Sequence, residues 1–179
     1  MFRLLPPPRT IEVAAAAILI GGSIAATPVA AERPSLPREL VGTWSLVAAD
    51  VQHPDGSISH DYGAAPRGRM MVDAAGRYTL MIYNSERPHF ASGDRAAGTP
   101  EDYRETALGM SVHYGMLSAD LKARTLTFAI EQASFANWNG TRQVRQYQLK
   151  GKVLRYTVAA RPNGDIPISI WRKADQIVK

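Results

Sequence analysis

Short stretches in which large apolar residues alternate with polar ones recur along this chain, and they limit its fold more than any other feature. In RYTLMIY (77–83) the second, fourth and sixth residues are large and apolar, and RTLTFAIEQ (124–132) repeats such a pattern. A period of two places successive side chains on opposite faces of a strand. Turn-forming sequences such as PDG (54–56) and PNGD (162–165) separate the stretches. The chain is therefore predicted to be built of short antiparallel strands.

The first of these strands is predicted within LVGTWSLVAADV (40–51). A strictly alternating chain would place five of its residues on one face, namely Leu40, Gly42, Trp44, Leu46 and Ala48. Further strands are expected after Val112 and in the segments TRQVRQYQLK (141–150), VLRYTVAA (153–160) and IPISIWRK (166–173). The count is eight or nine, and strands so closely spaced predict an all-β fold in which an antiparallel sheet closes into a barrel.

One region interrupts the alternation. Residues 84–98 are longer than most hairpin connections and predict a long loop at the mouth of the barrel. Thr99 and Pro100 then begin a short helix, with Asp102 placed to complete a capping box. We expect this helix to pack on the barrel or over its mouth. Helices do not alternate with strands anywhere in the chain, which excludes a parallel βαβ fold.

The first 31 residues differ from the rest. A basic start with Arg3 and Arg9 precedes an apolar run from Val13 to Ala26, which is shorter than the roughly 20 residues of a bilayer-spanning helix. Small residues at Val29 and Ala31 suit a cleavage site. We predict a secretory signal peptide at 1–31, a flexible leader at 32–39 and one domain at 40–175, working in the periplasm or outside the cell. The alternative is an uncleaved membrane anchor.

Composition excludes several classes of function. The chain has no cysteine, which rules out disulfides, thiolate metal sites and a thiol nucleophile. Its net charge is +5, but no window gathers basic residues as nucleic-acid-binding segments do. We therefore expect no nucleic-acid partner. We also expect no stable membrane insertion after signal cleavage, and we expect the protein to be a monomer.

Several segments, taken in order, resemble a known family. Gly42-Thr43-Trp44 resembles the Gly-x-Trp signature of lipocalins. The runs RPHFASGDRAAGTPEDYR (87–104), HYG (113–115), FANWNGTRQVRQY (135–147) and IWRK (170–173) resemble the bacterial lipocalin-like domain proteins. The resemblance spans the chain from about Leu40 to Lys173. It implies a calycin-type barrel around a cavity that binds small, mostly apolar or amphipathic molecules, and it supplies no catalytic residues.

Trp44 and Arg145 are the two residues most open to interpretation. In such barrels the tryptophan of the first strand usually plugs the closed end. Arg145 alternates with Tyr147 on the apolar face of its strand, where a charged group needs a partner. Two interpretations follow: Arg145 stacks on Trp44 at the barrel floor, or Arg145 and Tyr147 bind a ligand carboxylate, as the Arg-x-Tyr spacing of fatty-acid-binding barrels does.

A closed barrel of about eight strands has room for one small ligand. We predict that its ligand-binding residues are aromatic, with a few polar groups: Tyr78, His113, Tyr114, Phe128, Trp138, Arg145, Tyr147 and Tyr156.

An enzyme is the alternative: a cofactor-independent isomerase or cyclase that acts on a hydrophobic substrate in the same cavity. Related barrels have been recruited for such chemistry, and the acid and base would come from His89, His113, Tyr114 or Glu131. The four histidines lack the close spacing of a metal site, so neither metal nor cofactor is expected. A third possibility is a purely structural or partner-binding envelope protein with a filled barrel.

Overall fold

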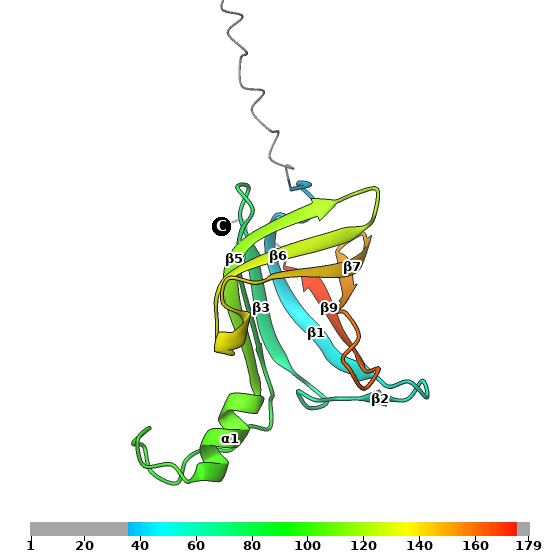
Figure 1. Cartoon of the computed structure of the whole chain (residues 1–179). Helices are drawn as coiled ribbons and strands as arrows, with labels where there is room; N and C mark the ends of the chain where they lie inside the picture. Colours follow the sequence, from blue (N-terminus) through cyan, green and yellow to red (C-terminus); the bar gives the residue numbers. More distant parts are fainter. Residues whose placement is uncertain (1–35, 175–179) are drawn as a thin grey trace, which may run out of the picture. The chain divides into compact units, whose positions relative to one another are not determined.

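The computed structural model describes residues 36–174, so the predicted signal peptide and the first four residues of the predicted leader lie outside the described residues. These residues form nine strands, one α-helix and one 3₁₀ helix (Figure 1). The elements are β1 (Gly42–Gln52), β2 (Ile58–Ser59), β3 (Arg67–Val72), β4 (Arg77–Tyr83), α1 (Pro100–Leu108), β5 (Met110–Asp120), β6 (Thr125–Ala133), η1 (Ala136–Trp138), β7 (Arg142–Lys150), β8 (Val153–Thr157) and β9 (Ile166–Lys173).

The sheet closes on itself. Every pairing is antiparallel, and the strands follow one another in the order β2-β1-β3-β4-β5-β6-β7-β8-β9. The first long strand, β1, pairs with β3 on one side and with β9 on the other, so eight strands form a barrel and the two-residue β2 adds to β1. The predicted closed antiparallel barrel is confirmed.

One end of the barrel is filled by large apolar side chains. Trp44, Leu126, Leu154 and Trp171 are fully buried there. The segment before β1 closes this end, because Leu40 is buried and its carbonyl accepts a hydrogen bond of 3.1 Å from the Trp44 indole. Trp44 therefore plugs the closed end, as the sequence indicated.

The cation beside Trp44 is Lys173, and the predicted stacking of Arg145 on Trp44 is wrong. Lys173 lies directly opposite Trp44 in the β1–β9 register, and its Nζ is 5.3 Å from the centre of the indole ring. The same Nζ donates a hydrogen bond of 2.7 Å to the carbonyl of Glu39. Arg145 stands on β7, which is not a neighbour of β1 in the barrel.

An irregularity in β1 shifts its inward face by one residue. The β1–β9 register changes between Leu46 and Ala48, as it does at a β-bulge. Beyond this point Ala49 and Val51 are the buried residues. The prediction that Ala48 shares the face of Trp44 is therefore wrong, because strict alternation ends at the bulge.

The helix begins where the sequence predicted. The Thr99 hydroxyl accepts from the Asp102 amide at 3.2 Å, and the Asp102 carboxylate accepts from the Thr99 amide at 2.9 Å. None of the helix residues is buried, and Figure 1 shows α1 beyond the ends of β4 and β5 rather than across the barrel. Within residues 36–174 no helix has the length and apolar character needed to cross a bilayer.

Candidate ligand-binding site

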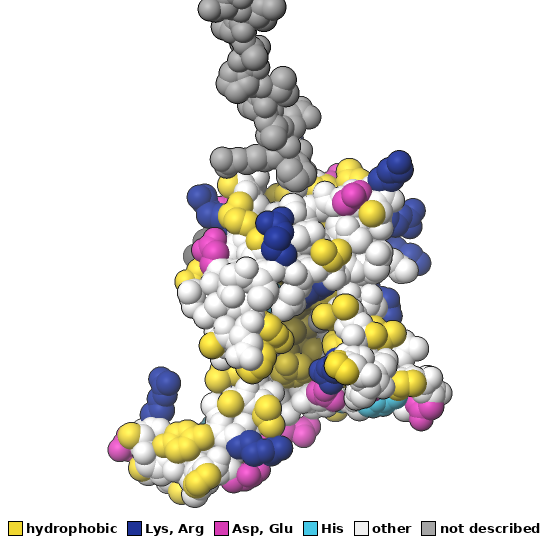
Figure 2. Space-filling view, in the orientation of Figure 1, with side chains coloured by type: hydrophobic (Ala, Val, Ile, Leu, Met, Phe, Trp, Pro, Cys, Tyr) yellow, Lys and Arg dark blue, Asp and Glu magenta, His cyan; other side chains and the backbone are white. Residues whose placement is uncertain are grey.

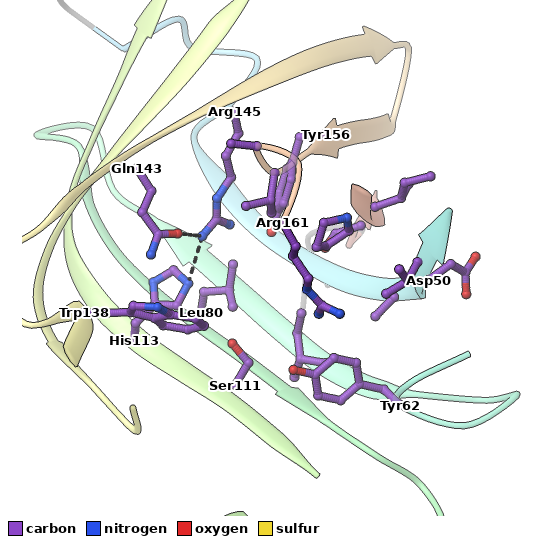
Figure 3. Close-up of a pocket in the computed structure, with 18 residues that line it drawn as sticks. Asp50, Tyr62, Leu80, Ser111, His113, Trp138, Gln143, Arg145, Tyr156 and Arg161 are labelled. Atoms are coloured by element: carbon purple, nitrogen blue, oxygen red, sulfur yellow. Dashed lines mark hydrogen bonds between the residues drawn. The ribbon is translucent and has the colours of Figure 1, made fainter. Parts of the chain in front are cut away.

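A cavity of about 240 Å³ lies inside the barrel at the end away from Trp44 (Figure 3). Strands β1, β4, β5, β7, β8 and β9 all contribute to its wall, because the inward face of each strand points to the same interior. Much of the wall is aliphatic, including Val51, Leu80, Ile82, Val158 and Ile168. Polar side chains stand at a few positions within this apolar surface.

The cavity lies where the barrel wall is incomplete. Pairing between β7 and β8 begins at Gln146 and Thr157, so in the described residues the first part of β7 is paired with β6 but not with β8. After Thr157 the chain stays with β9, because the Val158 amide bonds to the Pro167 carbonyl at 2.9 Å. Figure 2 shows a hollow below β7, lined largely by hydrophobic side chains. Gln143 and Arg145 stand on this part of β7, which is paired with β6 alone among the described strands.

Arg145 is the charged group deep in the cavity. It is 5% exposed, and its guanidinium lies over the rings of Phe128 and Tyr156, with its carbon 4.0 and 5.0 Å from the ring centres. Its Nη2 donates to the Gln143 side-chain oxygen at 2.9 Å, while its Nε has no hydrogen-bond partner among residues 36–174. Cation–π contacts of about 2 kcal/mol each offset only part of the cost of burying this charge.

His113 stands beside Arg145 and is uncharged. Burial and, secondly, the nearby Arg145 charge lower the pKa of His113 to about 3. Its Nε2 is 3.4 Å from Nη2 of Arg145. A guanidinium only donates hydrogen bonds, so Nε2 must offer its lone pair and the ring proton belongs on Nδ1. From there it is donated to the Tyr78 hydroxyl, 2.8 Å away.

Tyr78 and Phe128 pack behind the polar residues. Tyr78 meets Phe128 edge to face, with ring centres 5.0 Å apart, and His113 meets Phe128 at 5.8 Å. Burial is the main cause that raises the pKa of Tyr78, so its hydroxyl remains protonated at neutral pH. This aromatic packing restrains the rings on which Arg145 rests.

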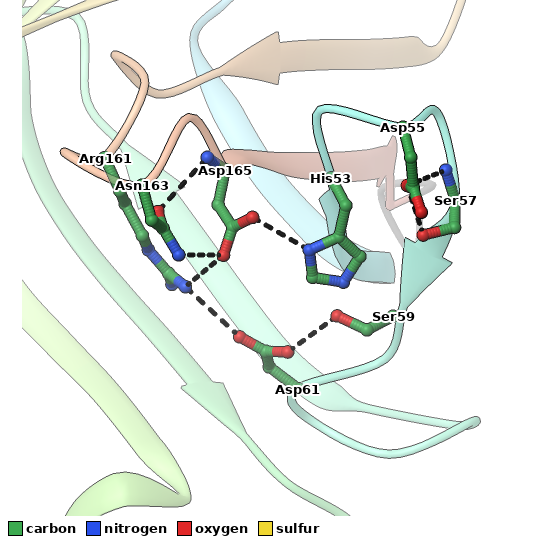
Figure 4. A network of polar contacts seen from close by, with 8 residues as sticks. All are labelled: His53, Asp55, Ser57, Ser59, Asp61, Arg161, Asn163 and Asp165. Carbon is green, nitrogen blue, oxygen red and sulfur yellow. Dashed lines mark hydrogen bonds and ion pairs between the residues drawn. The ribbon is translucent and has the colours of Figure 1, made fainter.

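Polar contacts among three loops form the rim of the cavity (Figure 4). His53, at the end of β1, bonds through Nδ1 to Asp165 at 2.8 Å. Arg161 lines the cavity and lies 3.6 Å from Asp61 and 3.9 Å from Asp165. The contacts join the β1–β2 turn, the β2–β3 loop and the β8–β9 loop. Tyr62 also lines the rim, and burial raises its pKa.

The structure places the eight sequence-predicted residues in three groups. Four line the cavity: His113, Trp138, Arg145 and Tyr156. Tyr78 and Phe128 pack behind them.

Tyr114 and Tyr147 lie away from the cavity. Tyr114 follows His113 in β5 and therefore points outward, with 45% of its surface exposed. Tyr147 is partly buried at the other end of the barrel, beside Leu121 and Leu149. Tyr147 thus cannot act with Arg145 as an Arg-x-Tyr pair on one ligand group.

Sequence reasoning missed Gln143, Ser111, Tyr62 and Arg161 in the cavity wall. Gln143 and Ser111 each precede a predicted residue by two positions, so alternation alone could have found them. Tyr62 and Arg161 come from loops without periodicity, and nothing in the sequence indicates where they point.

The residues considered for proton transfer are scattered. His89 is exposed in the long loop, and Glu131 and Tyr114 are exposed on the outside of the barrel. His113 alone among the four candidates faces the cavity. With a pKa of about 3 it is a poor general acid or base at neutral pH.

The chain is similar to two solved structures at low sequence identity. A crystal structure of a lipocalin-like protein from Bacteroides uniformis is 14% identical, with 76% of this chain and 99% of that chain covered and a TM-score of 0.40. A mutant of the fluorescent protein UnaG is 15% identical, with 77% and 98% covered and a TM-score of 0.36. A comparison with curated proteins found no match.

The family assignment rests on a different comparison. The family model described as "Lipocalin-like domain" matches residues 41–174, from the start of β1 to the end of β9. This range covers the whole barrel and most of the chain. The chain belongs to the lipocalin-like domain family.

Proposed function

We propose that this protein binds a small, mostly apolar molecule in the barrel cavity. The observation that carries the proposal is the cavity itself: about 240 Å³ of space with an aliphatic and aromatic wall, beside a break in the β7–β8 pairing. Binding sites for small molecules are typically concave and apolar, with a few polar groups that orient the ligand. A barrel that was filled by its own side chains would offer no such space.

The size of the cavity limits the ligand. Sites for drug-sized molecules usually occupy about 300–1,000 Å³, and this cavity is somewhat smaller. A compact molecule with a short chain or one or two rings suits it better than a long chain or a larger ring system. Its polar end would meet His113, Gln143 and Arg145, and its apolar part would contact Leu80 and Ile82.

We propose further that binding takes place outside the cytoplasm. The support lies in the first 31 residues, where a basic start, a short apolar run and small residues before Glu32 follow the pattern of a secretory signal.

Native mass spectrometry of protein purified from its own host tests the proposal directly. We expect the native protein to carry a bound small molecule. Denaturation should release it, and a solvent extract of the protein should contain a compound of the same mass. A binding assay with an apolar naphthalene dye provides the second test, because such a dye becomes fluorescent when it leaves water.

Two variants on β5 show where the dye binds. Ser111→Phe adds a ring within the cavity and should abolish dye binding. Met116→Phe adds one on the outer, exposed face of the same strand and should leave binding unchanged. Equal dye binding by both variants would contradict the proposal.

A further inference from the structure

Arg145 carries a buried charge that no carboxylate of the described protein neutralises. The ion pairs found within residues 36–174 join other residues, and the contacts of the Arg145 side chain are with two rings, the neutral amide of Gln143 and the neutral imidazole of His113. With 5% exposure it cannot obtain full hydration from solvent either. Its Nε, moreover, is buried and has no hydrogen-bond acceptor in the part of the chain that the structure describes.

The other charges in the cavity wall do not compensate for it. Asp50 is the one carboxylate among the wall residues, and it accepts from Nδ1 of His60 at 2.8 Å. In Figure 3 its carboxylate points away from Arg145. Arg161 is the second cation of the wall, and its partners are Asp61 and Asp165 at the rim. Among the described wall residues, those at the deep end of the cavity thus contribute the positive charge of Arg145 and no negative charge.

We propose that the ligand carries one carboxylate, or a similar singly charged anionic group, which binds the Arg145 guanidinium at the deep end of the cavity. This inference rests on the proposed function and names the chemical class of the ligand: a small monocarboxylic acid with a compact apolar body.

The contacts around Arg145 suit such a ligand. An ionised acceptor forms a hydrogen bond roughly twice as strong as a neutral one, so a carboxylate competes favourably with the Gln143 amide for Nη2. His113 is neutral and donates toward Tyr78, so it adds no second charge to the deep end. The apolar body then extends along Leu80 and Ile82 toward the rim, where water is accessible.

Four probes separate the charge from the apolar body: octanoate, 1-octanol, octylamine and acetate. Isothermal titration calorimetry on the purified protein should show that octanoate binds at least about tenfold more tightly than 1-octanol, since a buried charge pair contributes that much or more. Octylamine should bind most weakly of the three eight-carbon probes, because its cation meets Arg145. Acetate should bind far more weakly than octanoate, because it lacks the apolar body.

Two variants on β7 assign the preference to one residue. Arg145→Met retains the length of the side chain without its charge, and it should bind 1-octanol as well as the unmodified protein does while losing the preference for octanoate. Without ligand it should melt at the same temperature or higher, because an uncompensated buried charge has been removed. Arg142→Met changes an exposed arginine on the opposite face of the same strand and should preserve the preference.

The outcomes distinguish this inference from the proposed function. Equal affinity of the unmodified protein for octanoate and 1-octanol would overturn the inference and leave the binding of apolar molecules intact. An acetate affinity equal to that of octanoate would also overturn it, because the site would then recognise a bare anion. Binding of none of the eight-carbon probes would contradict the proposed function and this inference together. The probe comparison needs no variant, so it decides the question even if Arg145→Met does not fold.

Discussion

Nη2 of Arg145 lies 3.4 Å from Nε2 of His113, so a guanidinium that is always charged sits next to an imidazole that must stay neutral. The two residues come from β5 and β7, on either side of β6, and meet inside the barrel. This pairing dictates the tautomer of His113, with its proton on Nδ1 toward Tyr78. It also couples the charge of the cavity to the stability of the fold.

The stability of the protein should fall in mild acid because of His113. Its pKa is about 3 in the folded chain against 6.5 as its ordinary value, so between these pH values the unfolded chain binds a proton that the folded chain does not. The contribution of the neutral His113 to the free energy of unfolding is fully present above pH 6.5 and decreases as the pH falls toward 3. Between pH 7 and pH 5 the free energy of unfolding of the unmodified protein should fall by about 2 kcal/mol more than that of His113→Gln.

Urea denaturation at several pH values measures this difference. His89→Gln changes an exposed histidine and should follow the unmodified protein. Parallel pH profiles for the unmodified protein and His113→Gln would show that His113 titrates normally and is not held neutral beside Arg145.

Trp44→Ala should destabilise the protein by about 3–5 kcal/mol, the usual cost of removing a large buried aromatic side chain. Trp44 is fully buried at the closed end, and the variant also lacks the hydrogen bond that the indole donates to the Leu40 carbonyl. Trp138→Ala removes a partly buried tryptophan from the cavity wall, so it should cost less stability and reduce dye binding instead. Denaturant melts of both variants test the contrast, and a loss below about 1 kcal/mol for Trp44→Ala would contradict the role of a plug.

Gly115→Ala should cost about 3 kcal/mol. Gly115 adjoins the register shift between β5 and β6, with a φ of +155°, and a Cβ there would lie 2.1 Å from the Ala129 carbonyl oxygen. That oxygen is main chain within β6, so it cannot move aside without disturbing the sheet. Gly93→Ala is the control, because a Cβ there meets nothing within 4 Å. In thermal melts Gly115→Ala should have a much lower melting temperature than Gly93→Ala. Similar melting temperatures would refute the steric argument.

We predict that the mature protein begins at Glu32, because the short apolar run and the small residues at Val29 and Ala31 follow the pattern of a signal-peptidase site. N-terminal sequencing of the protein from the periplasm or the medium tests this. Protein that retains Met1 and fractionates with membranes would support the anchor instead.

Local chemistry was enough to predict most of the elements. The two-residue period marked β4 and β6, the turn sequences at 54–56 and 162–165 marked hairpin ends, and Thr99 with Asp102 marked the start of α1. These signals work because strand alternation, turn formation and helix capping depend on residues within a few positions of one another.

Other features of the barrel could not be predicted from local patterns. The shift in β1 that turns Ala49 inward, the lack of β8 beside the first part of β7, and the choice of Lys173 rather than Arg145 as the cation at Trp44 all depend on the register between strands far apart in sequence. Local patterns and the resemblance predicted a closed barrel and offered eight candidate ligand-binding residues. Barrel closure then decided which of them face the cavity and left Arg145 without an acidic partner within residues 36–174, because closure brings together strands that no local signal connects.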